Sequence, residues 1–253
     1  KIFEGPLLKD KISNKNNSFT LTLYYFSLSI SGLIILTLIL NSNHFAQSSN
    51  IEVQNFFLSL LALICVMGII AGLYPFSCNN ILISKNKTLK KEILENKEIK
   101  YLKMEGHHPN CEKFQDHIFY FKDNTYCAGC TGLVTGGIVS LILVAIGFLR
   151  IIPLNYFNII FYAGLITQLI TLTYFMIIRQ SRNILKIFFN IIFVLSYCLL
   201  FISVIIAYNN IFLYLYVTIL LFVVILTRTS ISRYKHKIIC NDCNLMECDI
   251  PFN

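Results

Sequence analysis

Charged residues are scarce in this sequence. They make up 13% of its 253 residues, and six long stretches contain no Asp, Glu or His: roughly 19–40, 55–76, 131–149, 153–178, 184–207 and 211–228. A membrane segment without such side chains has no ready group for proton or cation coupling. The chain also lacks a nucleotide-binding loop, a hydrolase triad and a metalloprotease helix. These absences argue against a transporter and against the common classes of enzyme.

Apolar residues are abundant instead. Hydrophobic side chains account for 56% of the chain, with 21 Phe and 14 Tyr, which is too apolar for an ordinary soluble domain. Each of the six stretches is long enough to cross a hydrocarbon core about 30 Å thick. The sequence therefore predicts an all-α polytopic membrane protein with six transmembrane helices in the lipid bilayer. Because only the turn Asn209-Asn210 separates the last two helices, we expect them to form a tight hairpin.

The basic residues predict how the chain is oriented. Of 21 Lys and Arg residues, 20 fall in the N-terminal tail, the 77–130 loop, the 179–186 turn or the C-terminal tail. Only Arg150 falls on the other side, and the 41–54 loop has no basic residue. By the positive-inside rule, both termini and the 77–130 loop face the cytoplasm, and the protein lies in the cell membrane. This topology accounts for the net charge of +8, so no nucleic-acid partner is required.

We therefore divide the chain into five parts. These are a cytoplasmic tail at 1–18, two transmembrane helices within 19–76, a cytoplasmic loop at 77–130, four transmembrane helices within 131–228, and a cytoplasmic Cys-rich tail at 229–253. Within the loop, residues 81–104 mix apolar residues with seven Lys and three Glu, the pattern of an amphipathic helix. This helix either rests on anionic lipid or covers the rest of the loop with its charges in water.

Two features predict how the membrane helices pack. Gly68 and Gly72, and likewise Gly132 and Gly136, have the four-residue spacing that lets helix backbones approach closely. Both pairs fall at similar depth, so the second and third helices are expected to pack there, unless these are merely the small residues common in membrane helices. Gln168 is the one strongly polar residue deep in the membrane, and we expect it to hydrogen-bond to another helix.

Cysteine and histidine gather in the 77–130 loop. Cys127 and Cys130 are two residues apart, a spacing that lets a tight turn present both sulfurs to one ion. Upstream of them lie four further candidates, His107, His108, Cys111 and His117. The aromatic run 118–121, a polar turn and residues 125–126 predict two strands that deliver Cys127, as in a zinc ribbon.

The ligand types favour zinc. On the reducing side of a membrane, clustered thiols are more often metal ligands or redox groups than structural disulfides, and four thiolate and imidazole ligands suit Zn²⁺. Two sites can be assembled: Cys111, Cys127 and Cys130 with His107, His108 or His117, and Cys240, Cys243 and Cys248 with a ligand such as His236. A single site built from both Cys pairs is the alternative. By contrast, Cys65 and Cys198 lie in apolar helices and are expected to be packing residues.

The motif itself resembles a known group of proteins. The pattern His-His-Pro-Asn-Cys, then His117, then Cys-Ala-Gly-Cys-Thr-Gly opening an apolar helix is similar to an uncharacterised family of prokaryotic multi-pass membrane proteins, in particular its archaeal members. The resemblance covers roughly residues 107–140. It implies a membrane protein with a metal site at His108, Cys111, His117, Cys127 and Cys130, and it implies no particular reaction.

Three functions remain open. The one we favour is a zinc-stabilised, non-catalytic scaffold or accessory subunit that docks a protein partner at its cytoplasmic face or forms a homo-oligomer. It would carry one or two zinc ions and show no turnover alone. The second is a membrane thiol or metal redox protein, because Cys127 and Cys130 can cycle with a disulfide. The third, a transporter, is disfavoured by membrane helices without carboxylates or histidines.

Overall fold

Six helices dominate the architecture. The computed structural model describes residues 6–42, 50–73, 104–105, 108–109, 117–121, 124–150, 156–178, 182–208 and 210–242. The helices in these ranges are α1 (Pro6–Asn41), α2 (Ile51–Leu73), α5 (Ala128–Leu149), α6 (Phe157–Ile177), α7 (Asn183–Ala207) and α8 (Ile211–Asp242). Each contains a stretch long and apolar enough to cross a membrane, which confirms the six predicted segments.

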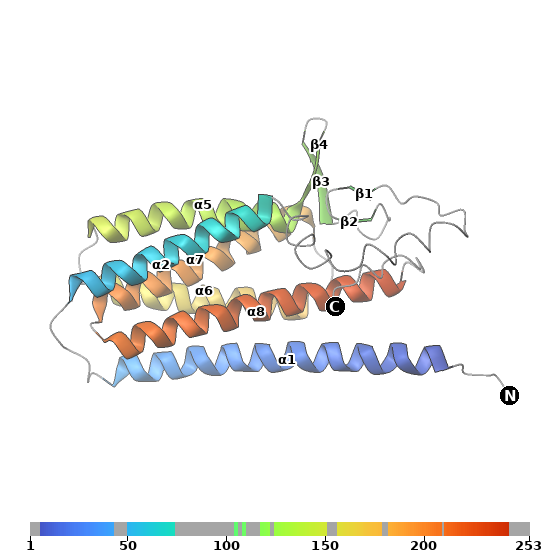
Figure 1. Ribbon diagram of the computed structural model, residues 1–253, viewed down its shortest axis with the longest axis horizontal. Coiled ribbons are helices and arrows are strands. Elements are labelled where there is room, and N and C mark those ends of the chain that lie inside the picture. The colour runs from blue at the N-terminus through green and yellow to red at the C-terminus, as the bar shows by residue number, and fades with distance from the viewer. Residues whose placement is uncertain are drawn as a thin grey trace, which may run out of the picture.

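The helices form an elongated bundle with α7 near its centre (Figure 1). α7 packs most extensively against α5 and α6, α2 covers α5, and α1 pairs with α8. Burial follows from this arrangement, since the run Ile202–Ile206 of α7 is buried at every position. The connection between α7 and α8 is short, as predicted, yet α8 packs more extensively against α1 than against α7.

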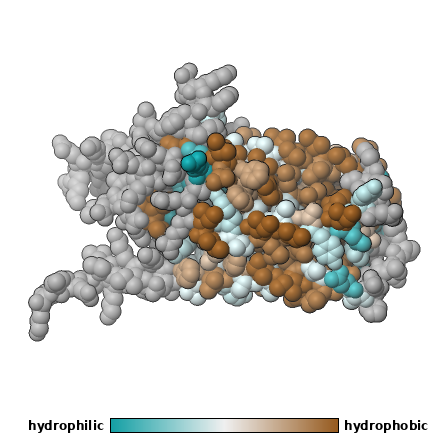
Figure 2. Space-filling view, turned by 180° about the vertical axis from the view of Figure 1, so that it is seen from behind, coloured by the Kyte–Doolittle hydropathy of each residue, from teal (hydrophilic) through white to brown (hydrophobic). Residues whose placement is uncertain are grey.

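Large apolar side chains cover the outside of the bundle. Many of them are more than half exposed, for example Leu38, Met67 and Ile159. Figure 2 shows hydrophobic residues over most of the described part of one face, with more hydrophilic residues toward the ends. Such a surface is compatible with a lipid bilayer, in which exposed apolar side chains meet acyl chains instead of water.

Two helices extend past their predicted limits. α1 already begins at Pro6, and α8 continues to Asp242, beyond the predicted boundary at 228. The apolar span of α8 runs over Ile211–His236 because this segment keeps enough apolar residues among its three basic ones. Part of the predicted C-terminal tail is therefore helical. α1 begins, and α8 ends, at the same end of the bundle as the β-hairpin (Figure 1).

Short strands lie at that end. β3 (Ile118–Phe121) and β4 (Asn124–Cys127) pair in antiparallel fashion, with Ile118 opposite Cys127, which confirms the predicted hairpin. β1 (Met104–Glu105) and β2 (His108–Pro109) form a second, two-residue ladder that the sequence did not predict. The predicted amphipathic helix, apart from Met104 in β1, lies outside the described residues.

The glycine spacing correctly predicts that α2 packs on α5, but it wrongly predicts which residues each glycine faces. α2 does pack on α5, but through Gly72, which faces Val134, and Gly137, which faces Ile69. Gly68 faces open space. Gly132 and Gly136 lie instead against the backbone of α7, where a Cβ on Gly132 would be 2.5 Å from the carbonyl oxygen of Ile187. The spacing predicted a close backbone approach, but the neighbour is α7 because α5 is packed on two sides.

Candidate functional site

Two thiols meet where the hairpin joins α5. Cys127 is the last residue of β4 and the N-cap of α5, and Cys130 lies in the first turn of that helix. Their side chains are hydrogen-bonded to each other. Thr131 Oγ1 donates to the Cys127 carbonyl oxygen at 3.0 Å, which fixes the junction. We call this end of the bundle, where α5 begins and α6 ends, the thiol end.

Arg228 places a positive charge beside the two thiols. It comes from α8 and interacts electrostatically with both Cys127 and Cys130. Its guanidinium group lies 4.2 Å from the ring centroid of Phe175 on α6, within range of a cation–π interaction.

Asn190 of α7 holds the arginine in position. Its Oδ1 accepts hydrogen bonds from Arg228 Nη2 at 2.7 Å and from Nε at 3.2 Å. Its Nδ2 donates to the Lys186 carbonyl oxygen at 2.6 Å. The Asn190 side chain is buried and packs against Gly132 of α5, so one residue links three helices beneath the thiols.

Two imidazoles lie close together at the same end. His117 precedes β3, and His236 lies on the extension of α8, with ring centroids 5.7 Å apart and planes nearly perpendicular. The hairpin is also tied to α7, since Asn183 Nδ2 donates to the Ile118 carbonyl oxygen at 2.6 Å. Because Ile118 pairs with Cys127, the hairpin brings His117 near the thiols along the ladder.

These groups do not yet make a metal centre. Within the part of the chain that the structure describes, no three His, Cys, Asp or Glu side chains are grouped so as to hold an ion. The described donors are therefore a pair of thiols and a pair of imidazoles. Cys111, Cys243 and Cys248 lie outside the described residues, and His108 and Cys240 are described by their backbone alone. A four-ligand zinc site would need donors from among these residues or from His107, which also lies outside the described residues.

The remaining described cysteines behave as packing residues. Cys65 and Cys198 are buried and free, as predicted. Cys198 Sγ lies 3.6 Å from the Ser140 carbonyl oxygen on α5. Neither belongs to the thiol end, so they serve as internal controls for experiments on Cys127 and Cys130.

Gln168 fulfils its predicted role. Ser196 Oγ of α7 donates to Gln168 Oε1 of α6 at 2.5 Å, and both side chains are buried. Gln168 Nε2 has no partner within the described structure. The contact ties two helices together as membrane-buried amides commonly do, which favours a packing role over a substrate site.

Sequence reasoning missed Arg228 and Asn190. Arg228 was counted as a boundary residue, and Asn190 was hidden in an apolar run. The signal that could have revealed them is the combination of one Arg and one Asn in neighbouring helices predicted to pair, because a membrane-embedded cation needs a polar partner.

In comparisons with known proteins, the chain matches no family model, no curated protein and no solved structure.

Proposed function

We propose that this chain is a zinc-stabilised integral membrane protein that acts as a scaffold or accessory subunit rather than as an enzyme. The observation that carries the proposal is the junction of β4 and α5, where Cys127 and Cys130 lie in contact. Thiolates at this spacing are typical zinc ligands. Arg228 would offset part of their negative charge, and bound zinc would stabilise the junction of the hairpin with α5.

A docking role fits the position of the module. The hairpin projects from the end of the bundle at which α1 begins and α8 ends (Figure 1). The distribution of basic residues predicts that this end faces the cytoplasm. A hairpin tied to α7 through Asn183 offers a surface to a protein partner or to a second copy of the chain. Purification in mild detergent and mass measurement would test this part of the proposal, which requires a species larger than the monomer.

Zinc content tests the metal assignment. Purified protein should contain about one zinc ion bound through Cys127 and Cys130, and Cys127→Ser or Cys130→Ser should lose about one equivalent, because a closed tetrahedral site does not tolerate loss of a thiolate. Cys198→Ser, at a buried thiol outside the thiol end, should keep its zinc. Elemental analysis by mass spectrometry gives the readout. Unchanged zinc in Cys127→Ser would refute the assignment.

A thiol redox protein is the second candidate, and the contact between Cys127 and Cys130 beside Arg228 favours it. In this reaction the two thiols would form a disulfide and pass two electrons and two protons to a disulfide-bearing partner, which becomes a dithiol. Counting free thiols after exposure to oxidised glutathione distinguishes the two candidates. Rapid, reversible loss of two thiols in zinc-free protein supports the redox function, whereas stoichiometric zinc with slow oxidation supports the scaffold.

A further inference from the structure

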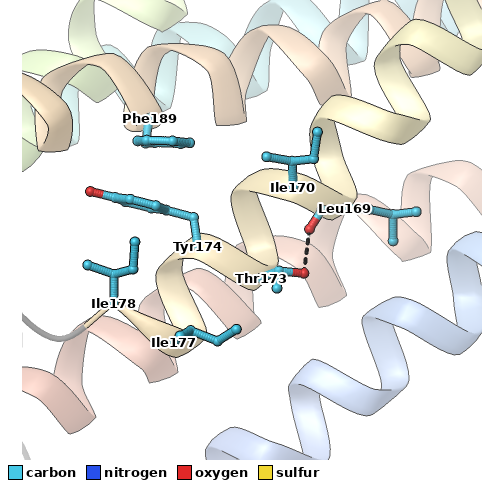
Figure 3. A pocket seen from close by; sticks show the side chains of 7 residues that line it. All are labelled: Leu169, Ile170, Thr173, Tyr174, Ile177, Ile178 and Phe189. Carbon is cyan, nitrogen blue, oxygen red and sulfur yellow. Dashed lines mark hydrogen bonds between the residues drawn. The ribbon is translucent and has the colours of Figure 1, made fainter.

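An apolar groove of about 390 Å³ lies on the outside of α6, toward the thiol end. α6 contributes most of its lining, including Ile170 and Ile177, and α7 contributes Phe189 (Figure 3). Ile170 is 54% exposed and Ile177 is 70% exposed, so the groove opens to the surface that meets the bilayer. Its dimensions and lining suit an acyl chain.

A polar group lies within this apolar lining. The ring of Tyr174 stacks on that of Phe189, with centroids 3.5 Å apart and planes within 11°. Its hydroxyl is directed toward the side of the groove where Ile178 lies (Figure 3). This Oη atom is buried and has no hydrogen-bond partner among the described residues. A buried tyrosine hydroxyl usually finds a partner, so Tyr174 keeps an unused hydrogen-bond donor at the edge of the groove.

Positive charge gathers at the same end of the groove. Lys235 Nζ of α8 donates to the carbonyl oxygen of Ile178, which lines the groove, at 2.5 Å. Lys186 of α7 and Arg228 both repel Lys235 electrostatically. The hydrogen-bond acceptors of Lys235 and Arg228, a backbone carbonyl and the Asn190 amide, are neutral. Glu52 is the only acidic residue whose side chain is described, and it lies at the opposite end of the bundle.

We propose that this groove and its basic end bind an anionic phospholipid. One acyl chain lies along α6, the phosphate lies against Lys235 and Lys186, and Tyr174 donates its hydroxyl proton to an oxygen of the headgroup or the glycerol. Arg228 faces the thiols and supplies long-range attraction only. The charge of the basic end selects an anionic lipid over a neutral one or over an apolar helix of another protein. The site is independent of zinc binding at Cys127 and Cys130.

Lipid affinity of the full chain in neutral detergent tests the proposal. Phosphatidylglycerol and phosphatidylcholine with identical acyl chains are titrated, and binding is followed by native mass spectrometry. We expect phosphatidylglycerol to bind roughly tenfold more tightly, because each basic residue near a membrane surface contributes to attraction of anionic lipid. Equal affinity for the two lipids would overturn the proposal.

Variants separate the charge from the groove. Lys235→Gln and Lys186→Gln should each lose most of the preference for phosphatidylglycerol, whereas Arg233→Gln, at an exposed residue on α8, should keep it. Thr173→Trp should weaken the binding of both lipids, because the larger side chain fills the groove. Its control is Thr135→Trp on α5, since both threonines are exposed and each donates to the carbonyl oxygen four residues earlier. Retention of full selectivity in Lys235→Gln would refute the headgroup assignment.

Soluble glycerol phosphate distinguishes a lipid site from a simple anion site. It carries the same phosphate without acyl chains and should displace phosphatidylglycerol only at concentrations far above those of the lipid. Displacement at equal concentration would show that the groove contributes nothing and would overturn the lipid assignment. Selectivity should persist in Cys127→Ser, so failure of the zinc proposal and failure of this one give different results.

Discussion

The two ends of the bundle each hold an arginine through a side-chain amide, and they differ in the burial of that arginine and in the groups around it. At the end opposite the thiols, Arg150 Nη2 donates to Gln54 Oε1 at 2.6 Å. At the thiol end, Arg228 donates twice to Asn190 Oδ1. Arg150 is exposed, whereas Arg228 is partly buried within the apolar span of α8. Arg150 can exchange its amide partner for water, whereas Arg228 depends on the protein for its hydrogen-bond acceptor.

The networks around the two arginines also differ. Gln54 Nε2 donates to Tyr214 Oη at 3.4 Å, and Tyr214 donates to the carbonyl oxygen of Ile205 at 3.0 Å, with Tyr208 O also in contact. That chain of hydrogen bonds ends on the backbone and presents no reactive group. Around Arg228, by contrast, lie two thiols and a second cation, Lys235. The two ends therefore differ in chemistry, because only the thiol end brings described thiols and cations together.

The largest expected effect concerns how closely α5 approaches α7 at each end. A Cβ on Gly132 would lie 2.5 Å from Ile187 O and 2.7 Å from Asn190 Cβ, so Gly132→Ala must separate the helices. We expect a loss of about 3 kcal/mol in the free energy of unfolding, at the upper end for overpacking, and displacement of Asn190 from Arg228. Thermal unfolding in detergent measures this.

Gly147 provides the matched control on the same helix at the other end. A Cβ there would meet only side-chain atoms at 3.4 Å or more, which is ordinary contact. Gly147→Ala should therefore be neutral or stabilising by up to about 1 kcal/mol, since alanine favours the helix. Equal destabilisation by the two substitutions would show that the thiol end is no more tightly packed than its opposite.

The second prediction compares the two amides. Asn190→Ala should lower the free energy of unfolding by about 2 kcal/mol, because it leaves a partly buried guanidinium group without its acceptor. Gln54→Ala should cost about 1 kcal/mol, because Arg150 is exposed and can bind water instead. Urea unfolding followed by far-UV circular dichroism would measure the free energy of unfolding of both variants. A larger cost for Gln54→Ala would reverse our ranking of the two ends.

Much of the fold could be predicted because it depends on local pattern. Apolar runs of sufficient length predicted six helices, and the sequence 118–127 predicted the hairpin that ends at Cys127. Partner choice depends on geometry that spacing does not encode. Gly132 and Gly136 have the same spacing whether they face α2 or α7, and only the complete bundle determines which. Helix ends at 6 and 242 were missed because polar residues can continue a helix outside the bilayer.

The candidate site was predicted in part. Cys127 and Cys130 were chosen by spacing, and the structure brings their side chains into contact. His117 was predicted to be a zinc ligand, and its ring lies against that of His236. Its role as a ligand stays a prediction. Arg228, Asn190 and Lys235 were not chosen, because their role comes from helices that are distant in sequence. Cys111, Cys243 and Cys248 remain predictions from the sequence alone.

The smallest expected effect is the loss of the Tyr214 hydroxyl, and it tests whether hydrogen bonds hold the Arg150 end together. Tyr214 is buried and its hydroxyl links Gln54 to the backbone at the α7–α8 connection, so Tyr214→Phe leaves buried carbonyl groups short of a donor. Its cost should be about 1 kcal/mol, as for other hydrogen bonds inside membrane proteins. Tyr162→Phe removes an exposed hydroxyl that donates to Asn41 Oδ1 at 2.8 Å at the same end, and it should cost less than about 0.5 kcal/mol, because water replaces the lost contact. Thermal unfolding of both variants measures the two losses of stability. Equal losses would mean that packing, for example of Phe57 on the Tyr214 ring, holds the Arg150 end together, and that its hydrogen bonds do not.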